Sequence, residues 1–319
     1  MQSTIPSLDL NDFLIGPKVN KLLFVENLGH AFNEVGFVAV KNHGLTDKLT
    51  QQLYKCFREF FQLPDEIKSK YDIPGLAGQR GYTGKRKENA KGSKVADLKE
   101  FYHVGQFQKP AEPELVKEYP DNVWPIEVPE MEEVALEAFR ILESAGLTLL
   151  KAIALYLNLD ENYFDNKVKN GNSILRAIHY FPIENKEDID SNAVRAGAHE
   201  DINLITLLMG ASAEGLEILN NQGVWIPVTA LPDQIVVNVG DMLSRLTNDK
   251  LKSTTHRVVN PSKEKLHEPR YSIPFFMHPR ADMDLTCLTG CIDSASPKKY
   301  PDITAGAFLH QRLREIGLS

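Results

Sequence analysis

The chain is 319 residues long, and its 42% hydrophobic and 25% charged residues are typical of a globular protein that buries a substantial core. Its formal net charge of -7 argues against a general binder of nucleic acid or of anionic membrane surfaces. Three cysteines are too few for a disulfide framework, and no apolar run suggests a secretory signal or a membrane span. We therefore predict a cytoplasmic protein with reduced thiols.

Helices are predicted to dominate the first part of the chain. A short strand over residues 5–10 precedes a helix over 19–35, whose apolar side chains recur at helical spacing. A strand over 37–40 then leads into a turn, in which we expect His43 to make a local hydrogen bond rather than to bind a metal. A second helix is predicted over 46–62.

A polar, glycine-rich stretch follows over residues 75–99. Long irregular segments in compact domains are usually functional or mobile, although a solvated basic loop would have the same composition. A strand is predicted over 97–104. A wide apolar stripe over 131–157 then predicts a long helix that braces the sheet, and we expect Gly146 to loosen it.

Short strand-like runs dominate the chain after residue 173. They cover residues 174–181, 198–208, 216–219, 225–228, 235–239, 253–259 and 270–276. Repeated short strands separated by turns such as 220–223 predict a sandwich or jelly roll. With helices before it and strands after it, the chain is predicted to be an α+β protein around one β core, in which the helices need the sheet to cover their apolar faces.

Candidate metal ligands lie in the run over 198–208, which we interpret as a buried strand with polar residues at its mouth. Side chains alternate along a strand, so His199 and Asp201 would share one face while Glu200 points to the other. His256 begins another β-branched run and could supply a third ligand. Three ligands on one face of an octahedron leave positions open for substrate and dioxygen, which favours ferrous iron over structural zinc.

A candidate anion clamp lies near the end of the strand-rich region. Arg270 is surrounded by apolar sequence and would share a strand face with Ser272, so a guanidinium and a hydroxyl could together bind a carboxylate. The alternative for Arg270 alone is an ion pair with one of the many acidic side chains. A His-x-Asp pair is also common by chance, so the combination of both motifs carries the prediction.

In this order and spacing, His199-x-Asp201, His256 and Arg270-x-Ser272 resemble the iron and 2-oxoglutarate dioxygenases of the isopenicillin N synthase-like family. Further segments similar to that family cover residues 5–10, 35–44, 60–64, 97–104 and 238–241, so the likeness extends over nearly the whole chain. The resemblance implies a double-stranded β-helix (jelly-roll) core over 171–285. It also implies an N-terminal non-haem dioxygenase region over 1–170 and a C-terminal segment over 286–319 that packs on the core.

The resemblance also implies an activity. Fe(II) would be held by the two histidines and the aspartate, and 2-oxoglutarate would chelate the iron while its far carboxylate meets Arg270 and Ser272. Tyr180 is a candidate contact to this co-substrate, and a buried core tyrosine is the alternative. With dioxygen, such an enzyme oxidises a C–H bond of a small organic substrate and releases succinate and carbon dioxide. Hydroxylation is the default outcome, and desaturation or ring closure are variants.

Three alternatives remain open from the sequence. An Fe(II) oxidase of the same fold could use the Arg-x-Ser pair for a substrate carboxylate, as isopenicillin N synthase does, and the His-Glu-Asp order here is similar to that enzyme. A zinc hydrolase could use the same three ligands, and a non-catalytic 2-oxoglutarate sensor could share the fold. Substrate contacts are expected from the stretch over 75–99 and from the C-terminal residues 302–319, which predict a short helix. Neither the substrate nor the oligomeric state follows from the sequence.

Overall fold

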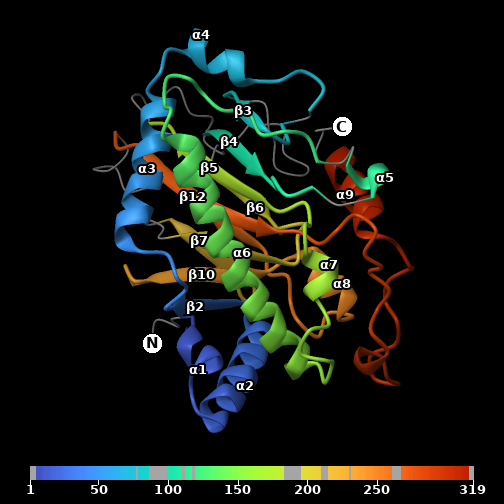
Figure 1. Cartoon of the computed structure of the whole chain (residues 1–319). Coiled ribbons are helices and arrows are strands. Elements are labelled where there is room, and N and C mark those ends of the chain that lie inside the picture. The colour runs from blue at the N-terminus through green and yellow to red at the C-terminus, as the bar shows by residue number, and fades with distance from the viewer. Residues whose placement is uncertain are drawn as a thin grey trace.

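A computed structural model describes residues 5–76, 78–85, 99–109, 112–116, 119–182, 195–209, 215–229, 231–260 and 267–315. Two β-sheets form the centre of the molecule, and helices cover the outer face of the larger sheet (Figure 1). Within these ranges, every helix is too short or too polar to cross a membrane.

The strands are β1 (Ser7–Asp9), β2 (Phe37–Lys41), β3 (Gly81–Thr83), β4 (Lys99–Gly105), β5 (Ile174–Tyr180), β6 (Ala196–His199), β7 (Ile205–Met209), β8 (Leu216–Leu219), β9 (Trp225–Pro227), β10 (Gln234–Val239), β11 (His256–Val258) and β12 (Arg270–Met277). The helices are α1 (Leu10–Leu14), α2 (Lys18–Glu34), α3 (Asp47–Phe61), α4 (Asp65–Lys68), α5 (Pro113–Val116), α6 (Met131–Tyr156), α7 (Asp165–Val168), α8 (Asp241–Leu246) and α9 (Ala305–Glu315), with 3-10 turns η1 (Ser69–Tyr71) and η4 (Thr289–Cys291).

The two sheets have the connectivity of a double-stranded β-helix. The larger sheet has the order β1-β2-β10-β7-β12-β5-β4-β3, and the smaller sheet has the order β6-β11-β8-β9. Neighbouring strands are antiparallel, except that β1 and β2 are parallel. Within the core, the chain crosses between the sheets from β5 to β6, from β6 to β7 and from β7 to β8. The predicted α+β fold with a jelly-roll core is therefore confirmed.

Side-chain alternation along the strands divides the core into two parts. In β10, Ile235, Val237 and Val239 join the large cluster beneath the helices, whereas Val236 joins a second cluster between the two sheets. Inner-facing residues of both sheets make up that second cluster, among them Phe37, Phe101, Ile178, Tyr180, Ala196, Ile218 and Val258. The space between the sheets is therefore lined on both sides, and polar side chains placed there lose most of their water.

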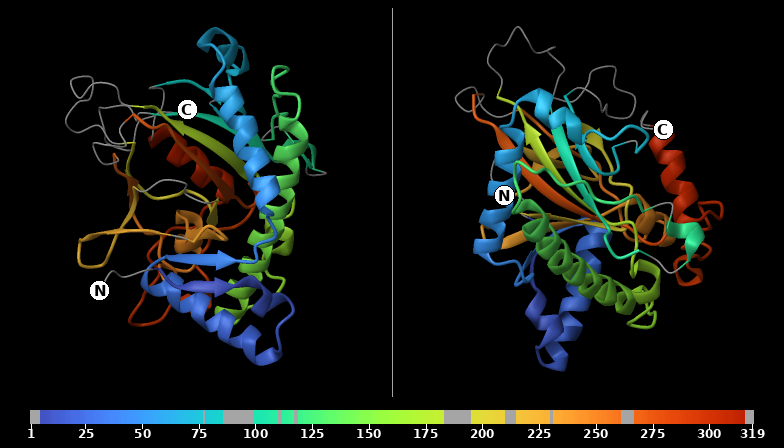
Figure 2. Two further views of the ribbon diagram at one scale, coloured as in Figure 1. Left: turned by 90° about the vertical axis from the view of Figure 1, so that its left-hand side faces the viewer. Right: turned by 45° about the horizontal axis from the view of Figure 1, so that its top comes forward.

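The long helix α6 braces the outer face of the larger sheet, with α3 beside it (Figures 1 and 2). Its predicted range, 131–157, is confirmed to within one residue. The expectation that Gly146 loosens this helix is wrong, because α6 is continuous through it. A Cβ atom at Gly146 would lie 2.4 Å from Sδ of Met277, so the glycine allows the helix to approach β12 closely.

The other predicted helices are also confirmed. The helix predicted over 19–35 is α2, and the one predicted over 46–62 is α3, which begins where the Thr46 hydroxyl accepts a hydrogen bond from the Leu49 amide. His43 makes the expected local bond, accepting from the Leu45 amide. The C-terminal helix expected within 302–319 is α9.

Several elements differ from the prediction. Helices α1 and α8 and strand β3 were not expected from the sequence, because each is too short to show a full period of apolar residues. The polar stretch over 75–99 contains β3, and its residues 77 and 86–98 lie outside the described ranges, so its predicted contact with substrate is not tested. The single strand predicted over 198–208 is two strands, β6 and β7, in different sheets.

Candidate active site

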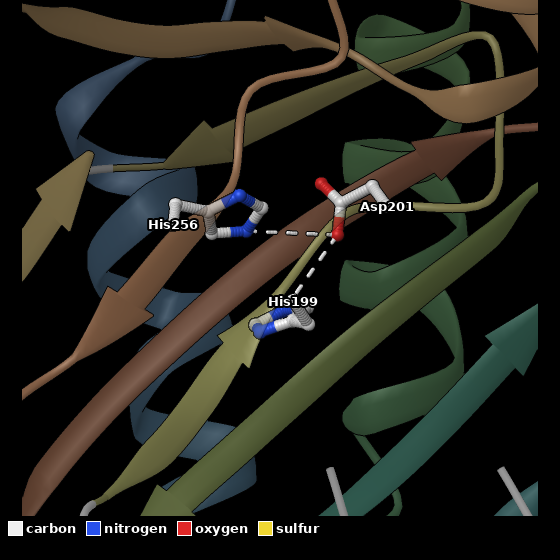
Figure 3. Close-up of side chains that lie close together, drawn as sticks. All are labelled: His199, Asp201 and His256. Atoms are coloured by element: carbon white, nitrogen blue, oxygen red, sulfur yellow. Dashed lines mark ion pairs between the residues drawn. The ribbon is translucent and has the colours of Figure 1, made fainter. Parts of the chain in front are cut away.

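The structure brings together the three predicted metal ligands at one end of the space between the sheets (Figure 3). Their ligand atoms all lie within 4.8 Å of one another. The Nε2 atoms of His199 and His256 lie 3.9 and 3.8 Å from the same Oδ1 of Asp201. His199 ends β6 and pairs directly with His256, which begins β11, so the smaller sheet sets the spacing of the two imidazoles. Such a cluster could hold a divalent metal ion.

Asp201 lies in the loop between β6 and β7, so the prediction of one continuous strand is wrong at this point. The loop is held by its backbone, with the Asp241 amide donating to the Asp201 carbonyl oxygen at 2.7 Å. The carboxylate still faces His199, whereas Glu200 turns away and accepts a hydrogen bond from the Thr255 hydroxyl. The chain leaves the smaller sheet after His199 and enters the larger one at Ile205, which is why alternation alone could not describe this segment.

Two side chains of the larger sheet fix the Asp201 carboxylate. The Thr206 hydroxyl donates to Oδ2 at 2.6 Å, and the Asn238 amide donates to the same oxygen at 2.8 Å. Asn203, which is fully buried, in turn donates to the Thr206 hydroxyl at 2.9 Å. Because Oδ2 is occupied by these two donors, Oδ1 is left facing the two histidines.

Backbone carbonyls set the tautomers of the two histidines. Nδ1 of His199 lies 2.7 Å from the Gly197 oxygen, and Nδ1 of His256 lies 3.1 Å from the Thr254 oxygen. A carbonyl can only accept, so each Nδ1 carries a proton and each Nε2 presents a lone pair toward Asp201. His256 is also fixed by edge-on packing against Phe37 of β2, at 5.6 Å between ring centroids.

Electrostatics favour the protonation states that metal ligands require. Partial desolvation of the half-buried side chain, together with repulsion from His256, lowers the pKa of His199, which favours the neutral imidazole near pH 7. Burial alone would raise the pKa of Asp201. The two histidines and the hydrogen bonds from Asn238 and Thr206 outweigh it and hold that pKa below its usual value. The carboxylate is therefore ionised beside two neutral nitrogen donors.

The predicted anion clamp lies on the inner face of the larger sheet. Arg270 begins β12, is 1% exposed and pairs directly with Tyr180 of β5, while Ser272 lies next along the same face. The Arg270 Cζ atom lies 5.0 Å from the Tyr180 ring centroid. Among the residues that the structure describes, Nε and Nη1 of Arg270 have no hydrogen-bond partner. A buried guanidinium in this state suits an anionic ligand such as a carboxylate.

Other inward-facing groups near the triad were not singled out from the sequence. His278 continues the face of β12 beyond Phe276, and burial lowers its pKa to about 4; both the Asp201 carboxylate and the Arg176 guanidinium act on it electrostatically. Arg176 of β5 lies between two aromatic rings, with its Cζ atom 4.3 Å from the Phe101 centroid and 5.3 Å from that of Phe276. Continued alternation from Arg270 through Ser272 is the signal that could have found Phe276 and His278.

A second arginine, Arg195, was also missed. It directly precedes β6, whose pairing with β11 shifts register between Ala196 and His199, so alternation along this strand does not place its side chain. It is 2% exposed, and its Nη2 donates to the Glu268 carbonyl oxygen at 2.9 Å. No alternation pattern in the sequence marks this arginine, because the pairing of β6 with β11 is irregular.

Two family models match the chain. The N-terminal model of non-haem dioxygenases in morphine synthesis matches residues 5–127, and the 2OG-Fe(II) oxygenase superfamily model matches residues 171–279. The chain is 34% identical to the proline hydroxylase buaE of Petromyces alliaceus over 97% of its own length and 98% of that protein. The chain therefore belongs to the 2OG-Fe(II) oxygenase superfamily, and the predicted resemblance is confirmed.

Solved structures agree with this assignment. A 2OG-Fe(II) oxygenase family protein from Caulobacter crescentus is 40% identical, with a TM-score of 0.87 over 98% of this chain and 99% of that one. A protein of Neurospora crassa in complex with alpha-KG (2-oxoglutarate) and thymine is 32% identical, with a TM-score of 0.85 over 97% of this chain and 96% of that one. The protein is accordingly an Fe(II)- and 2-oxoglutarate-dependent oxidoreductase that uses dioxygen, as predicted.

Proposed function

We propose that His199, Asp201 and His256 hold the Fe(II) ion. We also propose that the enzyme hydroxylates a C–H bond of a small organic substrate, with release of succinate and carbon dioxide. The observation that carries this proposal is the convergence of three ligand atoms within 4.8 Å at one end of a buried space. Iron and 2-oxoglutarate, when bound, supply the activation of dioxygen, and the chain supplies positioning and exclusion of water.

In this proposal the side chains of the three ligands are already oriented for metal binding when no metal is bound. Both Nε2 lone pairs and Oδ1 of Asp201 already face a common point, because backbone carbonyls and the pair Thr206 and Asn238 hold the rest of each ligand. Three protein ligands on one side leave the remaining positions for co-substrate and dioxygen. A neutral His199 also removes the competition between proton and metal near pH 7.

We assign the far carboxylate of 2-oxoglutarate to Arg270 and Ser272. The buried Arg270 guanidinium has donors without a partner in the described part of the chain, and Ser272 is 4% exposed on the same strand face. Tyr180 lies opposite Arg270 across the strand pair, so we propose that it packs against the guanidinium and borders the co-substrate. A bidentate guanidinium fork with a hydroxyl beside it matches a carboxylate group.

We further propose that the substrate lies beside Phe276, Arg176 and His278. Phe276 pairs with Thr206, which holds Asp201, so this ring is adjacent to the metal ligands. The Arg176 Nε donates to Nε2 of His103, which fixes the guanidinium between the two aromatic rings. This combination fits a small polar substrate that presents an oxygen acceptor, and thymine and proline, named for two relatives, belong to that class.

The experiment is a succinate-release assay with Fe(II), 2-oxoglutarate and a panel of small amino acids, organic acids and pyrimidines. We expect slow succinate formation without a substrate, stimulation by the true substrate, and loss of both in the variant His256→Ala. The matched control is His310→Ala, a histidine of α9 outside the site. Iron-loaded protein that consumes dioxygen with a substrate but never converts 2-oxoglutarate would contradict the proposal and indicate an oxidase of the isopenicillin N synthase type.

We also propose a cytoplasmic location, supported by the three free, buried cysteines Cys56, Cys287 and Cys291. The division of the chain into a region over 1–170, a core over 171–285 and a C-terminal segment over 286–319 remains our proposal for its organisation.

A further inference from the structure

Three arginines rank among the largest fully buried side chains, and they differ in how their nitrogens are used. Arg80 donates to acceptors from all three nitrogens: Nε to the Pro120 carbonyl, Nη1 to the Gln79 carbonyl and Nη2 to the Asn172 side chain. These hydrogen bonds within the fold account for the burial of Arg80. Arg195 and Arg270 are equally buried, yet each keeps at least one nitrogen without a partner among the described residues. Their burial therefore has no complete structural explanation.

The two guanidinium groups come from opposite sheets and lie near each other. Arg270 begins β12 of the larger sheet, and Arg195 directly precedes β6 of the smaller one. Nη2 of Arg195 donates to the carbonyl of Glu268, which is close to Arg270 in the chain. Burial and the charge of Arg270 together lower the pKa of Arg195 to about 10, although Tyr180 and Glu268 act in the opposite direction. Tyr180 thus lies beside both cations.

Two buried positive charges repel, and a pair of this kind is stable only where an anion compensates it. In the part of the chain that the structure describes, neither guanidinium forms an ion pair with a carboxylate. Glu268 attracts Arg195, but its hydrogen bond to Arg195 comes from the backbone carbonyl. Among the described residues, the two guanidinium groups therefore keep donors and positive charge that an anionic group between them could use.

Distance along the strand supports a shared ligand. Arg195 directly precedes β6 and His199 ends it, and four residues of strand span at most roughly 13 Å. A dicarboxylate chelated beside His199 would extend along this strand toward Arg195 while it reaches Arg270 on the facing sheet. A carboxylate has lone pairs for more than one guanidinium fork, so both arginines can bind it together.

We propose that Arg195 is a second binding residue for the far carboxylate of 2-oxoglutarate, approaching from the smaller sheet while Arg270 and Ser272 approach from the larger one. This inference rests on the proposed binding of that carboxylate at Arg270. Its consequence is selectivity: the pair of cations makes the enzyme discriminate strongly between 2-oxoglutarate and a 2-oxo acid that lacks the second carboxylate.

The test compares two ligands on anaerobic Fe(II)-loaded protein by titration calorimetry. One ligand is 2-oxoglutarate, and the other is 2-oxopentanoate, which has the same chelating head but a methyl end. In Arg195→Met we expect the affinity for 2-oxoglutarate to fall by about tenfold or more, because a charge-assisted bond is lost. The affinity for 2-oxopentanoate should stay within about twofold, since that ligand has no group for Arg195. Arg195→Lys keeps the positive charge, so its affinity for 2-oxoglutarate should fall less than that of Arg195→Met.

Arg80→Lys is the matched control, because it changes an equally buried arginine that is fully hydrogen-bonded elsewhere, and it should leave both affinities unchanged. Unchanged 2-oxoglutarate affinity in Arg195→Met would overturn the inference about Arg195 alone. An equal loss for both ligands would also overturn it, because the effect would then be structural. A wild-type protein that binds iron but fails to bind 2-oxoglutarate would overturn the proposed function as well, and so the two failures are distinguishable.

Discussion

At the scale of single residues, the direction of the Asp201 carboxylate depends on side chains that do not themselves face the metal position. Thr206 and Asn238 both donate to Oδ2, and Asn203 supports Thr206 from behind. A carboxylate without these bonds could rotate and present either oxygen. The support comes from β7 and β10 of the larger sheet, whereas the histidines belong to the smaller sheet.

Removing one of these donors should weaken iron binding. We expect Thr206→Val to lower the affinity for Fe(II) by about tenfold, because loss of an outer hydrogen bond to a metal ligand typically has an effect of this size. Competition with a chromophoric chelator under anaerobic conditions measures it. Thr247→Val is the control: Thr247 is also buried, but its hydroxyl donates to helix carbonyls of α8, so iron affinity should not change. Equal iron affinity in wild type and Thr206→Val would contradict this role.

A second group of buried charges lies on the outer face of the larger sheet. Glu100 is fully buried and accepts hydrogen bonds from Lys68 at 2.8 Å and from the Tyr82 hydroxyl, while its other oxygen lies 2.8 Å from Nδ1 of His179. Lys68 is itself 2% exposed. The carboxylate is thus satisfied on both oxygens, on the face of the larger sheet opposite to the proposed site.

Glu100→Gln should destabilise the protein without altering the metal site. We expect a loss of about 3 kcal/mol in the free energy of unfolding, since the change leaves the buried Lys68 ammonium paired only with the exposed Asp65 carboxylate. Urea unfolding monitored by circular dichroism measures the loss. Adding Lys68→Met should restore part of the stability, because the buried charge that lost its buried partner is then removed. If Glu100→Gln is as stable as the wild type, the pair of Glu100 and Lys68 makes no net contribution to the free energy of unfolding.

The same group predicts a pH dependence. Burial alone would raise the pKa of Glu100, but the bonds from His179, Lys68 and Tyr82 outweigh it and hold the pKa below its ordinary value of 4.5. A carboxyl with a lowered pKa in the folded state stabilises the fold above the unfolded-state pKa, and this contribution disappears as the pH falls through the folded-state value. The stability difference between wild type and Glu100→Gln should therefore be full near pH 7 and shrink below pH 4.5. A difference that grows on acidification would contradict the assignment.

At the scale of elements, the helices α2 and α6 cross at a glycine. A Cβ atom at Gly29 would lie 2.0 Å from the ring of Tyr156, so only a glycine allows this approach. We expect Gly29→Ala to destabilise the protein by about 1–3 kcal/mol through overpacking, although alanine is the better helix former. Thermal unfolding measures it, with Gly290→Ala as the control, since nothing lies within 4 Å of a Cβ atom there. In a protein that already carries Tyr156→Ala, the change Gly29→Ala should cause much less destabilisation, because the ring that it would contact is absent.

Among the described residues, an ion pair and two backbone hydrogen bonds link the C-terminal helix α9 to the rest of the molecule. Arg312 donates to Asp241 of α8 at 2.7 Å, and the side chains of Phe308 and Leu313 are buried. We expect α9 to be undocked in a larger fraction of molecules of Arg312→Met. Limited proteolysis should therefore cleave the C-terminal segment several-fold faster, while the free energy of unfolding of the core stays unchanged. The exposed neighbour Arg314→Met is the matched control. Equal cleavage rates in the two variants would show that apolar packing alone holds α9.

Elements with a full apolar period could be predicted from the sequence, and short ones could not. Helices α2, α3 and α6 and most strands were predicted to within a few residues, because each shows repeated apolar residues at one spacing. The run over 198–208 was predicted as one strand, because its break between β6 and β7 results from a change of sheet rather than from a turn residue. Local spacing carries no information about which sheet a strand joins.

At the scale of the whole molecule, the site depends on two sheets that face each other. The smaller sheet provides His199 and His256, and the larger sheet provides Arg270, Ser272 and the donors to Asp201. Motif order, through the resemblance to a known family, predicted which side chains form the triad and the clamp, and their binding roles remain our proposal. Arg195 could not be found in this way, because its proximity to Arg270 exists only once the sheets are packed together.

The most direct test of the central claim is an anaerobic titration of the Fe(II)-loaded protein with 2-oxoglutarate, following the visible charge-transfer band of a 2-oxo acid chelated to ferrous iron. We predict a saturable band that is absent in His199→Ala and that requires higher 2-oxoglutarate concentrations in Arg270→Met. Protein that demonstrably holds one iron yet gives no band at any 2-oxoglutarate concentration would contradict the assigned co-substrate site.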